Sequence, residues 1–285
     1  MEQFASGWKR NYYGKGDVIV YRLNRDGKTP AGQSPVFGAN VLMLVYGEAF
    51  WATYTTGDNT GLVATDSMKN FIQRQTAVFA GDDLADYCRF LASTFLDTYP
   101  QVEGAQVSAI EIPYAGVDGA VAFTPSGPER ATARVELGRG SPLPIVEAVA
   151  GIRGFKLLRL GGSAFRGFVR DEYTTLPDIT NRPVHMWLDV EWRYTDPQAA
   201  FGRNGVTKRA RQIVRDVFCT FESGSIQQVI YQMGVRLLEE IAMIADVHLE
   251  ANNRTWFAIT ERGDELGVYT DPTPPYGCLG LRLTR

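Results

Sequence analysis

The chain has 285 residues, of which 45% are hydrophobic and 21% charged, and its formal net charge at pH 7 is -3. This composition is typical of a soluble globular protein with a sizeable core, in one large domain or two of ordinary size. The slight acidity argues against general nucleic-acid binding, no apolar run approaches the roughly 20 residues that cross a bilayer, and the start lacks the apolar core of a signal peptide.

Cysteine and histidine are scarce in this sequence. The three cysteines, Cys88, Cys219 and Cys278, are widely spaced, which favours reduced thiols in a cytosol. His185 and His248 are the only histidines, and no Cys-x-x-Cys or His-Glu-x-x-His spacing exists, so no zinc site is expected. Gly-x-Gly-x-x-Gly and Walker-type loops are also missing. An enzyme with this sequence is therefore expected to use its side chains and its substrate alone, without a cofactor.

The first half of the chain predicts the order strand, strand, helix, helix, strand, strand. Residues 17–23 alternate as a strand does, and residues 40–46 form a continuous apolar run that predicts a strand buried on both faces. Thr65 and Asp66 lie where a strand is expected to end and a helix to begin, which is the place of an N-cap. The next helix is predicted from the apolar spacing within residues 84–95. Further strands are predicted at residues 106–112, 120–123 and 130–137.

The second half repeats this plan after a candidate linker, residues 138–144, which is rich in glycine and proline. Strand runs interrupted by helix pairs predict an α+β fold of antiparallel sheets with helices on one face. Two such units in tandem, residues 1–140 and 141–285, are the expected domains. Open four-stranded sheets leave unpaired edges, so pairing between copies into a closed barrel, and thus a homo-oligomer, is expected. The predicted elements are strands at 154–160, 183–194, 246–250, 256–260 and 278–283, and helices at 206–217 and 226–241.

Residues 161–176 fit neither a regular helix nor a regular strand. They place Phe165 and Arg170 in a glycine-broken segment, and Arg182 follows after a short polar turn. An irregular segment with an aromatic plate and guanidinium groups is suited to hold a flat polar ring, because loops often carry binding residues. A surface hairpin laced with salt bridges is the alternative interpretation.

Four short motifs are candidates for chemistry, and each has an ordinary structural alternative. Lys15 is a surface lysine unless burial or a positive neighbour depresses its pKa and makes it a base. Thr65 and Asp66 are either helix-capping residues or site residues. Residues 223–228 open a long helix, whose free N–H groups bind anions while Gln227 offers a donor and an acceptor; a capping box is the alternative. Asn253 lies between two strands, where asparagine usually forms turns.

Taken together, these motifs resemble the urate oxidase (uricase) family, whose members are built from paired tunnelling-fold (T-fold) domains. The resemblance runs in family order from Tyr13 to about Phe257. It rests on Tyr13-Gly14-Lys15, Tyr54-Thr55 with Gly57-Asp58-Asn59, Val63-Ala64-Thr65-Asp66-Ser67 with Lys69-Asn70, Phe168-x-Arg170-Asp171-Glu172-Tyr173-Thr174-Thr175-Leu176, Ser225-Ile226-Gln227 and Asn253.

The resemblance implies a role for each matched residue. Phe165 stacks under a purine, Arg182 and Gln227 clamp its pyrimidine edge, and the Ile226 N–H adds a donor. Thr65 and Asp66 reach the five-membered ring from a neighbouring subunit. The implied proton relay is Lys15 with Thr65, and Asn253 with Thr65 holds dioxygen or water above the ring.

The resemblance also implies an activity and an assembly. Such an enzyme converts urate and O2 to 5-hydroxyisourate and H2O2, through a urate anion and a hydroperoxide, with neither metal nor organic cofactor. Its T-fold units assemble into a β-barrel tunnel in a homotetramer with sites at subunit interfaces, without nucleic-acid or membrane partners. A cytoplasmic location is expected.

One position departs from the family pattern. Uricases carry a histidine two residues after the matched Asn253, and this sequence has Thr255 there. Threonine passes a hydrogen bond but does not titrate near neutral pH as histidine does. Three outcomes follow: a slower or pH-shifted uricase, an oxidase of a related oxopurine, or a purine-binding protein without catalysis.

Overall fold

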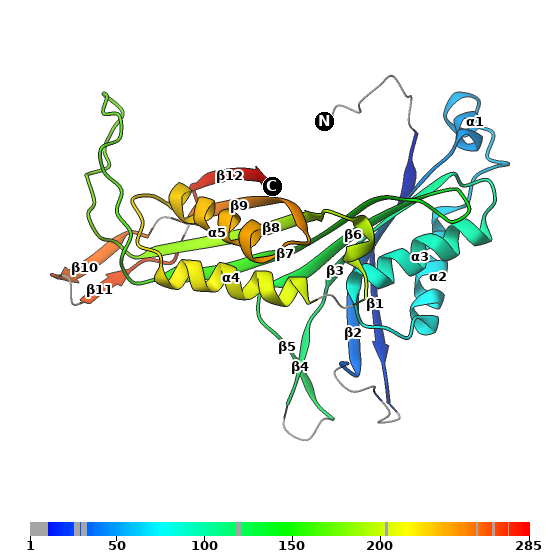
Figure 1. Cartoon of the computed structure of the whole chain (residues 1–285), viewed down its shortest axis with the longest axis horizontal. Helices are drawn as coiled ribbons and strands as arrows, with labels where there is room; N and C mark the ends of the chain where they lie inside the picture. The colour runs from blue at the N-terminus through cyan, green and yellow to red at the C-terminus, as the bar shows by residue number, and fades with distance from the viewer. Residues whose placement is uncertain are drawn as a thin grey trace. The chain divides into compact units, whose positions relative to one another are not determined.

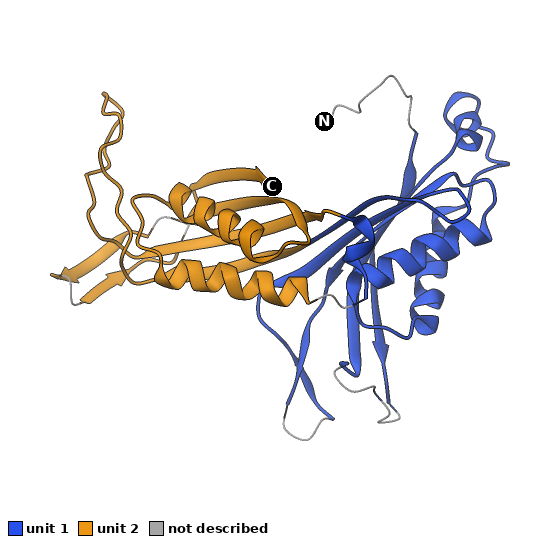
Figure 2. Ribbon diagram, in the orientation of Figure 1, with its two compact units in different colours: residues 1–150, 196–204 blue, residues 151–195, 205–285 orange. Residues whose placement is uncertain are grey.

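The computed structural model describes residues 11–25, 29, 33–117, 121–202, 205–254, 256–263, 266–272 and 274–285. The chain forms two compact units, unit 1 of residues 1–150 with 196–204, and unit 2 of residues 151–195 with 205–285 (Figure 2). The assignment of residues 1–140 and 141–285 to separate T-fold units stays a prediction.

Unit 1 is an antiparallel sheet with two helices on one face (Figure 1). Its strands follow the order β1-β2-β3-β6, and α3 packs on β3 and β6 while α2 packs on β1. A 3-10 turn with a short helix, and a separate two-stranded ribbon, were not expected. The elements are β1 (Tyr13–Leu23), β2 (Val36–Tyr46), η1 (Glu48–Phe50), α1 (Trp51–Thr55), α2 (Thr65–Val78), α3 (Leu84–Thr98), β3 (Gly104–Glu111), β4 (Tyr114–Gly116), β5 (Phe123–Pro125) and β6 (Arg130–Gly138).

The helices cover one face of this sheet, and β2 shows the consequence. Val41, Met43 and Val45 are fully buried, whereas Leu42 between them is 38% exposed. Within a single chain, this strand is therefore buried on the helix-covered face, and not on both faces as the sequence predicts. A strand in an antiparallel sheet alternates between a core face and an open face, even when its sequence is continuously apolar.

The two helices of unit 1 begin in different ways. Asp83 caps α3, and its carboxylate accepts the N–H groups of Ala85 at 2.9 Å and Asp86 at 3.0 Å. Helix α2 has Ala64 at its N-cap position without a side-chain cap, and Thr65 is its first helical residue, so the predicted N-cap is wrong. The element directly before α2 is the short helix α1 and not a strand. Instead, the Val63 N–H donates to the Tyr13 hydroxyl at 2.9 Å, which fixes where the helix starts.

Unit 2 repeats the plan, with strand order β7-β8-β9-β12 and helices α4 and α5. Strand β8 alternates strictly between buried and half-buried residues, and its buried Val184 and Met186 line a small cavity with residues of α4 and α5. The predicted strand at 154–160 begins at Ile145, directly after the candidate linker. The elements are β7 (Ile145–Arg159), β8 (Val184–Tyr194), η2 (Pro197–Ala200, in unit 1), α4 (Val206–Thr220), α5 (Ile226–Glu240), β9 (Ile244–Arg254), β10 (Ala258–Arg262), β11 (Leu266–Tyr269) and β12 (Tyr276–Thr284).

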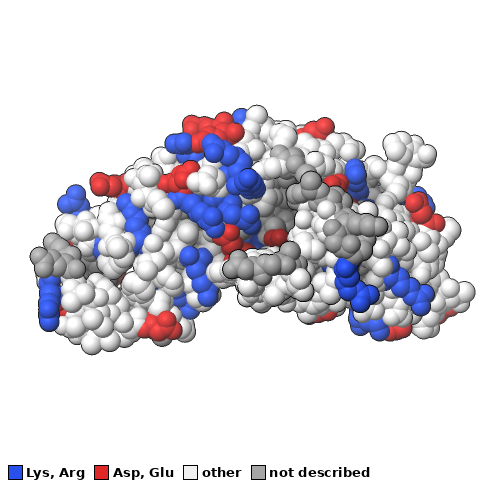
Figure 3. Space-filling view, turned by 90° about the horizontal axis from the view of Figure 1, so that it is seen from below, with Lys and Arg blue, Asp and Glu red and all other residues white. Residues whose placement is uncertain are grey.

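The fold is thus α+β with antiparallel strands, as the sequence predicts. Figure 3 shows a face on which Lys and Arg side chains mix with Asp and Glu. One such ion pair joins α4 to α5, where Arg209 binds Glu240, and Arg236 binds the same carboxylate from within α5. Within the described part of the chain, no helix combines the length and apolarity that crossing a membrane would require.

Candidate functional site

An irregular segment, residues 161–165, lies between two other parts of unit 2. On one side Ser163 bridges to Ser223 in parallel: Ala164 N–H donates to Ser223 O at 2.8 Å, and Ser223 N–H to Gly162 O at 3.0 Å. On the other side Phe165 and Ile179 exchange two hydrogen bonds of 2.8 and 2.9 Å. Backbone pairing therefore joins the segment to the entrance of α5 and to the residues before β8.

This pairing brings Arg182 to Phe165. The Arg182 N–H donates to Ser163 O at 2.9 Å, and its guanidinium carbon lies 5.5 Å from the centroid of the Phe165 ring. Burial lowers the pKa of Arg182, although a guanidinium stays protonated in proteins. Its buried Nε has no hydrogen-bond partner among the described residues. A half-buried cation with a free donor, beside an aromatic plate, is suited to a flat anion.

The start of α5 supplies further donors. Ser225 caps the helix and accepts the Gln228 N–H at 3.1 Å, while the Gln228 side chain accepts the Gly224 N–H at 2.8 Å. In a capping box, the Gln228 side chain would accept the backbone N–H of Ser225. Here it accepts the N–H of the preceding residue, Gly224. Ile226 is buried and Gln227 is exposed in the first turn, where the helix end favours negative charge.

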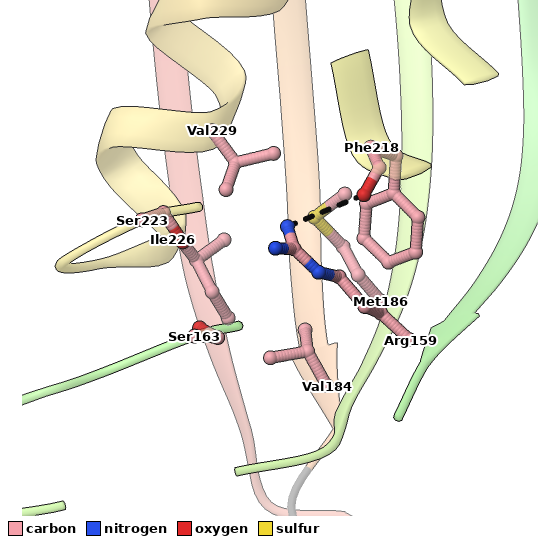
Figure 4. Close-up of a pocket in the computed structure, with 8 residues that line it drawn as sticks. All are labelled: Arg159, Ser163, Val184, Met186, Phe218, Ser223, Ile226 and Val229. Carbon is pink, nitrogen blue, oxygen red and sulfur yellow. Dashed lines mark hydrogen bonds between the residues drawn. The ribbon is translucent and has the colours of Figure 1, made fainter. Parts of the chain in front are cut away.

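Asn253 lies near the end of β9, where it pairs with Met186 of β8. Directly paired residues share a face of the sheet, so Asn253 lies on the face that carries Met186. Met186 lines a small cavity together with Ile226 (Figure 4). Four predicted site residues thus gather at one end of unit 2, and Asn253 lies on the same face.

Unit 1 holds Lys15, Thr65 and Asp66. Asp66 accepts hydrogen bonds from Lys69 Nζ at 2.6 Å and Asn70 Nδ2 at 3.0 Å. The hydrogen bond from Lys69, its charge, and the charge of Lys15 lower the pKa of the Asp66 carboxyl. Thr65 is exposed beside Asp66. The charge of Lys15 therefore acts on the Asp66 carboxyl, and Thr65 is the neighbour of Asp66 in the chain.

A β-bulge shapes the strand that carries Lys15. The register of β1 against β2 shifts between Lys15 and Val18, and Asp17 has a φ of 54°. Bulges re-aim side chains and occur frequently next to functional sites.

Thr255 lies outside the described residues, so its role stays a prediction. Its neighbour Arg254 lies 4.2 Å from the centroid of the Trp187 ring and 4.6 Å from that of Tyr276.

The alternative interpretation of residues 161–176 also holds in part. Arg170 pairs with Asp178 at 3.1 Å and donates to Leu176 O at 3.2 Å, which ties the loop to itself. Phe168 stacks on Phe165 with centroids 4.9 Å apart and an interplanar angle of 13°. One segment therefore contains both a salt-bridged loop and the aromatic ring of the candidate site.

The sequence interpretation missed Arg159 and gave no individual role to Ser163 or Ser223; all three residues line the cavity in Figure 4. The one signal was Gly162, which has a φ of 75° and whose added Cβ would lie 2.2 Å from an Arg159 nitrogen. A glycine in such a position marks a close approach. Among the described residues, no group of three or more His, Cys, Asp or Glu side chains is arranged to hold a metal ion.

The chain is similar to known proteins over nearly its whole length. The model of the Uricase family matches residues 11–142 and 148–279. A uricase of Haloferax volcanii is 37% identical over 96% of this chain and 97% of its own length. The uric acid degradation bifunctional protein of Bacillus sp. TB-90 is also 37% identical, and this chain spans 60% of its length.

Solved structures agree with these sequence matches. Urate oxidase from Bacillus sp. TB-90 superposes with a TM-score of 0.86 at 36% identity, covering 96% of this chain and 100% of that chain. A uricase from Bacillus fastidious gives a TM-score of 0.86 at 32% identity, over 96% and 93% of the two chains. The chain belongs to the uricase family.

Proposed function

We propose that this chain oxidises urate with O2 to 5-hydroxyisourate and H2O2, without a metal or an organic cofactor. One water molecule is consumed, since urate, O2 and H2O together supply the atoms of both products. The observation that carries this proposal is the cluster at one end of unit 2, where a half-buried guanidinium with a free Nε lies over Phe165. Membership of the uricase family supports the same substrate.

The cluster is assigned the task of binding a urate anion. Phe165 stacks under the purine, Arg182 and Gln227 clamp the pyrimidine edge, and the Ile226 N–H adds a donor at the start of α5. A guanidinium fork and a helix N-terminus both stabilise negative charge. Stabilising the anion matters because an electron-rich purine anion can itself transfer an electron to O2.

The second group of residues is assigned the protons and the oxygen. Lys15 and Thr65 accept the remaining purine proton, and Asn253 with Thr65 holds O2, and later water, above the ring. Thr255, which stands where the family has histidine, passes a hydrogen bond in this proton relay. Electron transfer and oxygen addition give a hydroperoxide, whose loss as H2O2 leaves an oxidised purine that water converts to 5-hydroxyisourate.

We further propose a homotetramer in which paired T-fold sheets close a barrel and Thr65 and Asp66 serve the site of a neighbouring subunit. The open face of unit 1 supports this assembly. Ile19, Tyr21 and Leu23 on β1 are 53%, 50% and 56% exposed. Large apolar side chains gathered on one strand face mark an interaction surface. A cytoplasmic location belongs to the same proposal.

Thr255 favours a second candidate, oxidation of a related oxopurine, because proton handling differs where the family has histidine. The test is loss of urate absorbance together with H2O2 release in metal-free buffer, followed by an aerobic panel of oxopurines analysed by mass spectrometry. We expect urate to be consumed faster than every analogue. Urate binding without turnover from mildly acidic to alkaline pH would instead identify a purine-binding protein.

A further inference from the structure

Arg159, the last residue of β7, lies where three parts of unit 2 meet. Its Nη1 donates to the carbonyl of Phe218 at 3.3 Å and to that of Phe221, and its Nη2 donates to Gly162 O at 3.0 Å. Phe218 lies in the last turn of α4, and Phe221 is its C-cap residue. A guanidinium is well placed there, because the carbonyls at a helix C-terminus are unpaired and carry partial negative charge.

The same junction leads to both halves of the candidate purine clamp. Gly162 O also accepts the Ser223 N–H, and Ser163 O accepts the Arg182 N–H. One short path therefore runs from Arg159 to Arg182, and another runs through Ser223 to the N-terminus of α5. The α5 donors and the Arg182 guanidinium are thus spaced by the backbone that Arg159 holds.

The side chains that surround Arg159 add few hydrogen bonds to those that the guanidinium makes with α4 and Gly162. The cavity in Figure 4 has a volume of about 10 Å³ and is lined by Ser163 and Ser223 as well as Arg159. Both serine hydroxyls are buried and have no hydrogen-bond partner among the described residues. Figure 4 shows the bond from the guanidinium to Phe218 at the end of α4, and its Nη2 binds Gly162 O in the segment that carries Phe165.

We propose that Arg159 is a positioning residue for purine binding, which sets the spacing between the Arg182–Phe165 pair and the first turn of α5. The proposal rests on the proposed function. Arg159 touches no substrate in this arrangement. Its effect is expected in ligand affinity, since the residues assigned to proton transfer lie in unit 1.

Arg285 provides a matched control within the same unit. It donates to the carbonyls of Leu238, Ile241 and Ile244, at the opposite end of α5. Arg159→Met and Arg285→Met therefore lose the same kind of bond, and both should lower Tm. Arg159→Lys keeps the charge but not the fork, so it serves as the conservative variant and as the replacement if Arg159→Met does not fold.

The experiment measures urate Kd by anaerobic titration, with Tm, kcat and the pH profile of kcat for each variant. We expect Arg159→Met to raise Kd roughly tenfold, Arg159→Lys to lie between it and the parent, and Arg285→Met to leave Kd unchanged. The pH profile should not move. If the parent chain binds urate but Arg159→Met and Arg285→Met have equal Kd values, the positioning role of Arg159 is overturned and the proposed function is not. A parent chain that binds no urate would overturn the proposed function as well.

Discussion

Arg182 combines a permanent charge with a half-buried setting over an aromatic ring. Desolvation lowers its pKa, and its free Nε leaves part of its hydrogen-bonding capacity for a ligand. Such a guanidinium binds most strongly to an anion that accepts two parallel hydrogen bonds from it.

Arg182→Ala is therefore expected to weaken urate binding by about 2 to 3 kcal/mol, the usual loss for a hydrogen-bonded charge. This corresponds to a rise in Kd of roughly 30- to 150-fold, measured by anaerobic titration. Arg182→Lys keeps the charge without the planar fork, so its Kd for urate should lie between that of the parent and that of Arg182→Ala. Parent-like affinity in the alanine variant would remove Arg182 from the clamp.

Lys15 follows a different expectation, because its assigned role is proton transfer. Lys15→Met should leave urate Kd near the parent value and lower kcat by about 10²-fold or more, as loss of a general base does. Stopped-flow turnover beside anaerobic titration separates the two quantities. Lys208→Met, at an exposed position on α4, is the control. An unchanged kcat in Lys15→Met would refute the relay assignment.

At the scale of elements, the helix starts differ in how much the sequence reveals. Asp83 is an N-cap of α3, and burial, followed by the charges of Asp86 and Asp82, raises the pKa of its carboxyl against the hydrogen bonds it accepts. The native chain therefore holds this proton more tightly than the unfolded chain. Its contribution to stability is present below the unfolded value of about 3.9 and declines as pH rises through the folded value.

Asp83→Asn should remove that decline while keeping the cap, since asparagine caps as well as aspartate. The difference in Tm between this variant and the parent should therefore increase in the variant's favour as the pH rises from about 4 to neutral. Asp83→Ala loses the cap and should cost about 1 kcal/mol. Thermal unfolding at fixed protein concentration over this pH range measures both. A Tm loss in Asp83→Asn equal to that of Asp83→Ala would contradict the argument.

Strong local signals explain which elements the sequence predicts. The helical spacing placed the starts of α4 and α5 at Val206 and Ile226, as observed. The first part of β7 escaped prediction because residues 148–152 are buried consecutively, which erases the alternation of a strand. Helix α1 is a single short turn rich in residues that favour strands, so its helicity depends on tertiary context.

The candidate site was predictable in composition more than in geometry. Family-like motifs point to Phe165, Arg182 and Gln227. The contact between Phe165 and Arg182, however, depends on the pairing of Ser163 with Ser223, which are distant in sequence and carry no pattern. Arg159 went unnoticed for the same reason, since its acceptors are backbone carbonyls, which any residue type provides.

At the scale of the whole molecule, the open sheet face of unit 1 exposes apolar side chains that the proposed assembly would cover. Ile19 is expected to be covered in the assembled protein, so Ile19→Lys should shift sedimentation toward smaller species, because burying an unpaired charge is costly. Val78→Lys, at an exposed position at the end of α2, should sediment as the parent does. A parent chain that sediments as a monomer at micromolar concentration would contradict the assembly.

The paired hydrogen bonds between Phe165 and Ile179 have a consequence for how this protein can change. They hold the two ends of the loop formed by residues 166–178 close together, so the positions of these ends do not depend on the length of the loop. Lengthening a surface loop whose ends are held costs little free energy. Phe168 inside this loop stacks on Phe165, and the family-like motif of residues 168–176 lies there too, so the tolerance applies to the length of the loop and not to these side chains. A change in loop length is therefore expected to leave the pairing of Phe165 with Ile179 intact, whereas a change at Phe168 removes a ring on which the Phe165 side chain packs.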